Sequence, residues 1–153
     1  MFLGSYKYSI DSKGRISIPA KMRKSLKPEA NETFIMTIGT EKCIVVYPLD
    51  EWKKLNEKIL EKTEEFITLD DRARREMFSN ATDDKFDTQA RLLLPKHLIA
   101  HAELEKEALI IGVMNKIEIW DPKNYDTYRN GGEQTYSEMM ENVMSKKEKV
   151  KGE

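Results

Sequence analysis

Short runs of apolar residues, several of them alternating with polar ones, recur along the chain in two similar sets. In the first half of the chain they predict strands at residues 6–10, 15–18, 33–38 and 43–47. In the second half they predict strands at 85–87, which is the weakest signal, and at 91–94, 108–112 and 116–120. Pro19 and Pro95 each follow the second strand of a set and should begin a short helical turn, where a proline costs little.

The two sets belong to an internal repeat. Residues 11–19 read Asp-Ser-Lys-Gly-Arg-Ile-Ser-Ile-Pro, and residues 87–95 read Asp-Thr-Gln-Ala-Arg-Leu-Leu-Leu-Pro. A second block at residues 39–47 returns in the same order at residues 112–120, both beginning with glycine and ending with an aromatic residue. This ordered agreement indicates a duplication.

The duplication suggests a division of the chain and a fold. We expect a first repeat over residues 5–52, connecting helices over 53–79, a second repeat over 80–126, and a C-terminal helix with a charged tail over 127–153. A repeat of about 45 residues with four short strands buries too little surface to be stable alone. The two repeats should therefore share one core, most economically as a closed β-barrel with a pseudo-twofold axis that leaves no strand edge unpaired. The expected class is mainly β with α, a β-barrel plus helices.

Helical periodicity marks the segments outside the strands. Trp52, Leu55, Ile59 and Phe66 fall near one face of a first helix, and a second helix is predicted over residues 69–78. After residues 130–132 a third helix carries an apolar stripe, which we interpret as a packing face, before residues 146–153 fray. The stripe consists of Tyr136, Met139, Met140, Val143 and Met144.

Composition narrows the class of protein. The chain has 153 residues, 39% hydrophobic and 35% charged, which indicates a soluble globular protein. We find no apolar run of membrane-spanning length and no secretory signal, so a cytoplasmic protein without a membrane partner is expected. The single cysteine, Cys43, excludes an internal disulfide and a four-thiolate metal site.

The charge is unevenly distributed. The net charge is −1, yet residues 7–27 hold seven basic residues against one acid, Asp11. Clustered lysine and arginine are what DNA binding requires, because they displace counterions from phosphates. The average charge therefore conceals a basic segment that could face nucleic acid.

The centre of this basic segment is a predicted turn. Ser12, Lys13 and Gly14 form a three-residue hairpin loop, with Gly14 at the position that needs a left-handed backbone. Asp11 can accept hydrogen bonds from the loop and from Arg15, which would leave Lys13 outermost and Arg15 fixed in direction. An oriented arginine can read a guanine edge or bind phosphate. Alternatively, the Asp11–Arg15 pair only braces the turn. Further charge at the site is expected from Lys7, Lys21 and Arg23.

These motifs together resemble the MraZ family, of the wider SpoVT/AbrB group. The resemblance rests on the opening Met-Phe-x-Gly-x-Tyr, on the turn from Asp11 to Pro19, and on its second copy from Asp87 to Pro95, and it covers nearly the whole chain. It implies a double-split, swapped-hairpin barrel and a ring-shaped homo-oligomer. It also implies a bacterial, nucleoid-associated transcriptional regulator of the division and cell-wall gene cluster, binding double-stranded DNA at direct repeats in its own promoter. The family's DNA-contacting motifs map onto Asp11 with Arg15 and onto Asp87 with Arg91.

The second copy of the turn departs from the first. Gln89 replaces Lys13 and Ala90 replaces Gly14. Alanine resists a left-handed backbone, so the second loop is expected to adopt another geometry. We therefore expect the first repeat to supply most of the phosphate affinity, and the second repeat, with Gln89 and Arg91, to have a weaker or a packing role.

Two other classes of function are alternatives to DNA binding: an enzyme and a protein-interaction module. An enzyme is disfavoured, because His97 and His101 lack the glutamate of a zinc-protease motif and no phosphate loop or nucleophile elbow is present. We therefore expect no catalytic residue, metal, cofactor or small-molecule substrate. A MazE-like antitoxin or other protein-interaction module is the stronger alternative, with residues 139–153 covering a toxin. Such antitoxins carry one repeat per chain, whereas this chain carries two.

Overall fold

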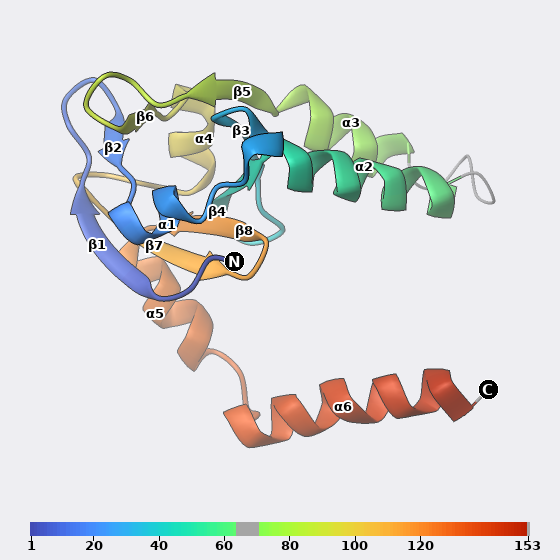
Figure 1. Cartoon of the computed structure of the whole chain (residues 1–153). Helices are drawn as coiled ribbons and strands as arrows, with labels where there is room; N and C mark the ends of the chain where they lie inside the picture. The colour runs from blue at the N-terminus through green and yellow to red at the C-terminus, as the bar shows by residue number, and fades with distance from the viewer. Residues whose placement is uncertain (64–70, 153) are drawn as a thin grey trace. The chain divides into compact units, whose positions relative to one another are not determined.

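The computed structural model describes residues 1–63 and 71–152, which divide into two compact units, Met1–Pro122 and Lys123–Glu153. Figure 1 shows the elements. The strands are β1 (Ser5–Ser9), β2 (Arg15–Ser17), β3 (Thr33–Ile38), β4 (Cys43–Pro48), β5 (Thr82–Lys85), β6 (Arg91–Leu93), β7 (Glu107–Val113) and β8 (Lys116–Trp120). The helices are α1 (Ala20–Lys24), the 3-10 turn η1 (Pro28–Ala30), α2 (Leu49–Thr63), α3 (Asp71–Ser79), α4 (Lys96–His101), α5 (Pro122–Asn130) and α6 (Tyr136–Gly152).

The strand pairing follows the duplication. Six strands form one antiparallel sheet in the order β1-β7-β8-β4-β3-β5, and β2 pairs with β6 in a separate two-stranded ribbon. Strand β1 of the first half pairs with β7 of the second half, and strand β5 of the second half pairs with β3 of the first half. Exchanging the two halves reproduces the same set of pairings. The fold is thus a mixture of sheet and helix in which each half completes the other.

The expected closed barrel is not formed by the hydrogen bonds of the described strands. The large sheet ends at β1 and β5, because the chain leaves it at each turn to form β2 and β6. These two short strands pair with each other and bring their inward-facing Ile16 and Leu92 into the hydrophobic core. The result is a sheet with a ribbon packed against it.

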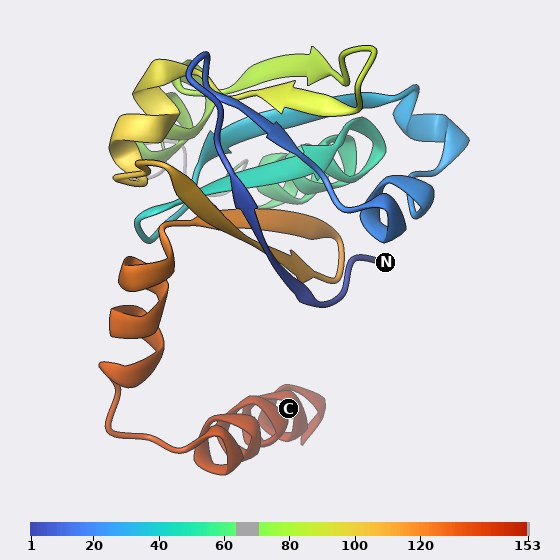
Figure 2. The same ribbon diagram turned by 90° about the vertical axis from the view of Figure 1, so that its left-hand side faces the viewer.

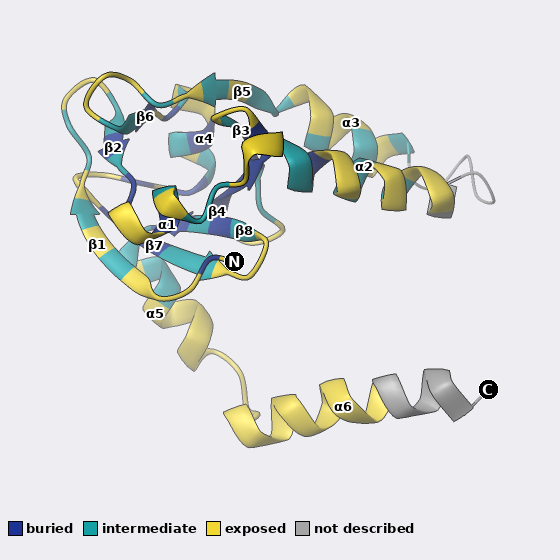
Figure 3. Cartoon of the chain, in the orientation of Figure 1, coloured by how far each residue is buried: buried dark blue, intermediate teal, exposed yellow. Residues whose placement is uncertain are grey.

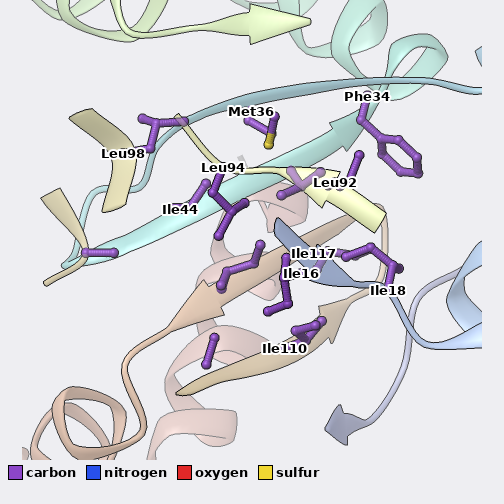
Figure 4. Packing of buried hydrophobic residues seen from close by; sticks show 14 of the residues in the cluster. Ile16, Ile18, Phe34, Met36, Ile44, Leu92, Leu94, Leu98, Ile110 and Ile117 are labelled. Carbon is purple, nitrogen blue, oxygen red and sulfur yellow. The ribbon is translucent and has the colours of Figure 1, made fainter. Parts of the chain in front are cut away.

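The core lies between the ribbon and the large sheet (Figure 4). Ile16 and Leu92 from the ribbon contact the same cluster as Ile44, Ile110 and Ile117 from the sheet, and all five are almost completely buried. Each fully buried side chain of this size contributes about 1.5–3 kcal/mol through the hydrophobic effect. The ribbon is therefore anchored from within, and its outward face is free to carry polar side chains.

Several elements differ from the sequence-based expectation. β5 occupies Thr82–Lys85 rather than residues 85–87, because the Asp87 carboxylate binds backbone amides of the turn that follows. α6 continues to Gly152 instead of fraying at residue 146, in keeping with the high helix propensity of its lysines and glutamates. Phe66 and the predicted start of the second helix at Leu69 lie outside the described residues.

Candidate nucleic-acid interface

The first turn is organised by one carboxylate. Asp11 Oδ1 accepts hydrogen bonds from the backbone N–H of Lys13 at 3.0 Å and of Arg15 at 2.8 Å. Asp11 Oδ2 accepts a hydrogen bond from Arg15 Nε at 2.6 Å. Gly14 has φ = +85°, the left-handed conformation that glycine adopts without strain. Because Nε is engaged by Asp11, the terminal guanidinium nitrogens are the part of Arg15 that can face a ligand.

The second turn repeats the first bond for bond. Asp87 Oδ1 accepts from the backbone N–H of Gln89 and of Arg91, both at 2.9 Å, and Asp87 Oδ2 accepts from Arg91 Nε at 2.9 Å. Ala90 has φ = +59°, so the expectation of a different loop geometry was wrong. The hydrogen bonds around the Asp87 side chain hold the alanine in the strained conformation that glycine adopts freely in the first turn.

This strain predicts opposite effects of two reciprocal substitutions. Ala90→Gly should raise the free energy of unfolding by about 0.5–1 kcal/mol, because removing the methyl group relieves a cost of about 1–2 kcal/mol, partly offset by the greater chain entropy of glycine. Gly14→Ala should lower the stability by a similar amount. Urea unfolding of the two variants beside the parent chain measures both effects. A loss of stability in Ala90→Gly would contradict the assignment of strain.

The same contacts shift the protonation of both aspartates. The pKa of Asp11 is lowered, chiefly because its carboxylate accepts the backbone hydrogen bond of Arg15, with smaller contributions from the Arg15 side chain and the Lys13 amide. The pKa of Asp87 is lowered in the same way, first by the backbone of Arg91. Each carboxylate is charged at neutral pH, so both arginines keep their orienting partner.

The outward face of the ribbon brings the two arginines together. In the β2–β6 register Arg15 lies opposite Leu93, and Ser17 lies opposite Arg91. The turns stand at opposite ends of the ribbon (Figure 2), yet Arg91 Nη1 reaches to 3.7 Å from Asp11 Oδ2. The side chains of Arg15 and Arg91 are 30% and 24% exposed, so each is partly held by its surroundings while remaining accessible.

The remaining predicted basic residues do not gather at the first turn. Lys7 is exposed in the middle of β1. Lys21 and Arg23 belong to α1, which follows the end of β2 remote from Lys13, and Lys21 lines a hollow with Gly4 and Tyr6. Arg23 is half-buried and its Nε donates a hydrogen bond to the Ile18 carbonyl at 3.1 Å. The structure therefore separates these residues from the Lys13–Arg15 group.

Two residues that the sequence reasoning missed do lie beside the ribbon. Lys96, the first residue of α4, lines a hollow of about 340 Å³ together with Lys13, Leu93 and Asp84. Leu93 is 50% exposed on the outward face, where the first repeat has Ser17. The antiparallel pairing of β2 with β6 places the start of α4 next to the turn of the first repeat, and this pairing is the signal that locates Lys96.

The residues considered for other chemistry have ordinary structural roles. His97 and His101 hydrogen-bond through Nε2 to the carbonyl oxygens of Asn80 and Glu41, at 3.0 and 2.9 Å. Cys43 is buried, and burial raises the pKa of its thiol to about 12, which suppresses its reactivity. Among the described residues, no group of three or more His, Cys, Asp or Glu side chains could hold a metal ion. Within the same part of the chain, no helix is long and apolar enough to cross a membrane.

The fold and the paired turns define a class of protein: two structurally equivalent halves in one chain, with strands exchanged, each presenting an aspartate-oriented arginine on a shared ribbon. A two-stranded β-ribbon has dimensions that fit the DNA major groove, and arginine there can donate two hydrogen bonds to one guanine. The arrangement is thus chemically suited to nucleic-acid recognition.

Comparison with known proteins agrees with this class. The family model described as "MraZ protein, putative antitoxin-like" matches residues 1–75 and 77–146. The protein named transcriptional regulator MraZ from Halothermothrix orenii is 43% identical over 145 residues, covering 91% of this chain and 94% of the relative. Proteins of the same name from Heliobacterium modesticaldum and Natranaerobius thermophilus are 41% and 39% identical, each covering 94% of this chain and 97% of the relative. The chain belongs to the MraZ family.

Proposed function

We propose that this protein is a sequence-specific DNA-binding transcriptional regulator that inserts its β2–β6 ribbon into the major groove. Arg15 and Arg91 read base edges, while Lys13, Gln89 and Lys96 contact the backbone close to the turns. The observation that carries the proposal is the repetition of one hydrogen-bonded Asp–Arg turn at both ends of a single ribbon. The names of the relatives support the same function.

We further propose a DNA target, an assembly and a cellular location for this regulator. The targets are direct repeats in the protein's own promoter, within the division and cell-wall gene cluster, and the protein binds them as a ring-like homo-oligomer in the cytoplasm at the nucleoid. The repeats span residues 5–52 and 80–126, separated by the helices of 53–79 and followed by 127–153. The exchange of β1 and β5 between the halves supports a relationship to the swapped-hairpin folds, with a sheet that is left open between β1 and β5. Lys7, Lys21 and Arg23 supply a broader basic surface for the flanking backbone.

The proposal is tested by binding to DNA without any other protein. Purified full-length chain is titrated into a labelled fragment from upstream of its own gene, across a series of salt concentrations, and the bound region is footprinted. We expect a protected stretch of direct repeats and a steep fall of affinity with salt, because phosphate contacts release counterions. Equal affinity for the upstream fragment and for an unrelated fragment of the same length would refute sequence-specific regulation.

The antitoxin-like description of the family makes a toxin partner the second candidate. In that case the protein would bind DNA weakly by itself and tightly only in a complex. The same titration separates the two functions, because a regulator that acts alone reaches its full footprint without a partner.

The unequal turns predict unequal effects when a glutamate is placed at the tip of each turn. Lys13→Glu should weaken binding at least tenfold, because it removes a phosphate contact beside Lys96 and introduces repulsion. Gln89→Glu should weaken binding much less, because no lysine occupies that turn. The slope of log affinity against log salt should also fall by about 1 for Lys13→Gln. Fluorescence anisotropy on the promoter fragment measures all three variants, and equal losses of affinity in the two glutamate variants would contradict the ranking.

A further inference from the structure

An apolar groove lies between α2 and α3, away from the ribbon. Its volume is about 440 Å³, and it is lined by Asn56, Ile59 and Leu60 of α2 and by Arg74, Arg75 and Phe78 of α3. Two contacts hold the helices in place. The ring centroids of Trp52 in α2 and Phe78 in α3 lie 5.4 Å apart. Thr37 Oγ1 of β3 donates a hydrogen bond to the Met77 carbonyl oxygen of α3 at 2.6 Å. The groove is therefore a built part of the first unit.

The residues that line the groove show what kind of partner it would bind. Asn56 Oδ1 is buried and has no hydrogen-bond partner among the described residues, which is costly for a polar atom. Leu60 is 55% exposed and Phe78 is 42% exposed, although both are large apolar side chains. At the rim, and counting only the described residues, Arg74 and Arg75 share one acid, Asp71, which leaves a surplus of positive charge on this part of the groove. A partner complementary to the groove would be apolar, would carry a hydrogen-bond donor and would have acidic residues.

Helix α6 in the second unit has these properties. Its apolar stripe follows the i, i+3, i+4, i+7, i+8 spacing of one helical face and is exposed over its whole length (Figure 3). The stripe was expected to be a packing face, and its side chains remain 42–73% exposed, namely Tyr136, Met139, Met140, Val143 and Met144. Tyr136 supplies a hydroxyl donor, and Glu141 borders the stripe. Methionine-rich faces adapt well to a groove on a partner.

We propose that α6 of one copy of this chain binds in the α2–α3 groove of a second copy. The methionines and Val143 cover Ile59, Leu60 and Phe78, and the acidic border faces the surplus charge of Arg74 and Arg75. Removing both apolar surfaces from water provides the free energy of association. The inference names the interface of the proposed homo-oligomer and so rests on that part of the proposed function.

Because the groove and the stripe are different surfaces, each copy offers one of each. Such a heterologous contact joins subunits head to tail and closes into a ring when the rotation between neighbours permits. A contact between two identical surfaces would stop at a dimer. This difference gives the interface a property that can be tested by mixing variants.

The test uses two full-length variants, each spoiling one surface. Met140→Glu damages the stripe, and Leu60→Glu damages the groove, while glutamate preserves helix propensity at both positions. Ser145→Glu on the opposite face of α6 and Lys58→Glu on the exposed face of α2 are matched controls. Mass is measured by light scattering after size-exclusion chromatography, and circular dichroism checks folding.

We expect the parent chain and both controls to be oligomeric, and each damaging variant to be monomeric and folded. An equimolar mixture of the two variants should form a dimer only, because one intact groove and one intact stripe remain to pair. Oligomers that survive both substitutions would overturn this interface while leaving the oligomer of the proposed function standing. A monomeric parent chain would overturn both, and monomers in the mixture would show that the surfaces do not pair with each other.

Discussion

Replacing Arg15 with alanine is expected to abolish recognition of the promoter. A single arginine with two hydrogen bonds to one base pair contributes about 1–3 kcal/mol of discrimination, which corresponds to roughly 5–150-fold in affinity. Every subunit of the proposed oligomer would lose this contact at once, so the combined loss should exceed a hundredfold. Arg15→Lys keeps the charge but loses the paired geometry, and it should bind promoter and unrelated DNA with nearly equal affinity. Anisotropy titrations with both fragments measure the affinity and the discrimination together.

The structure also provides the control for this experiment. Arg15 braces its turn through Asp11, so a loss of binding could reflect a disordered loop. Asp11→Asn disturbs the turn while keeping the guanidinium, and Lys54→Ala removes one positive charge from the exposed face of α2. If Lys54→Ala weakened promoter binding as much as Arg15→Ala, charge in general rather than the ribbon would account for the affinity. Unchanged promoter binding by a folded Arg15→Ala chain would refute the assigned role.

Changing the spacing of the DNA repeats should produce the second large effect. When several ribbons of one oligomer bind neighbouring repeats, each contact after the first is intramolecular and adds affinity without new chemistry. Inserting about 5 base pairs between two repeats rotates one of them to the opposite side of the duplex, because B-DNA turns once in about 10–10.5 base pairs. We expect a loss of one to two orders of magnitude in affinity, measured on fragments that differ only in the insertion.

An insertion of one full turn is the matched control for spacing. It restores the angular phase and changes only the distance, so a substantial part of the affinity should return. If the half-turn and full-turn insertions bound equally well, the subunits would act independently and the oligomer would add nothing to recognition.

The sequence was sufficient to predict the local elements and the first turn. The repeat located seven of the eight strands within about two residues, since each strand carries its own apolar pattern. The Asp11–Arg15 contact was also predictable, because a short acidic side chain before a glycine turn binds the nearest amides. These features depend on neighbours in the chain.

What the sequence did not reveal depends on long-range pairing. The expectation for the second turn was wrong because the backbone preference of alanine alone does not decide the conformation of Ala90. The three hydrogen bonds that Asp87 accepts around it outweigh that preference. Lys96 was missed because only the pairing of β2 with β6 brings it near Lys13. The open hydrogen-bonding pattern of the sheet likewise follows from β2 and β6 leaving to pair with each other.

Fusing the two halves into one polypeptide gives a direction to the ribbon that we propose to bind DNA. A symmetric dimer of identical halves would bind a DNA site equally well in either orientation. It would suit palindromic sites, whose two strands have the same sequence. Here one end of the ribbon carries Lys13 and Leu93 and the other carries Gln89 and Ser17, so the two ends are chemically distinct. A ribbon with two different ends can bind every site in the same orientation. Binding to sites arranged in tandem requires this property.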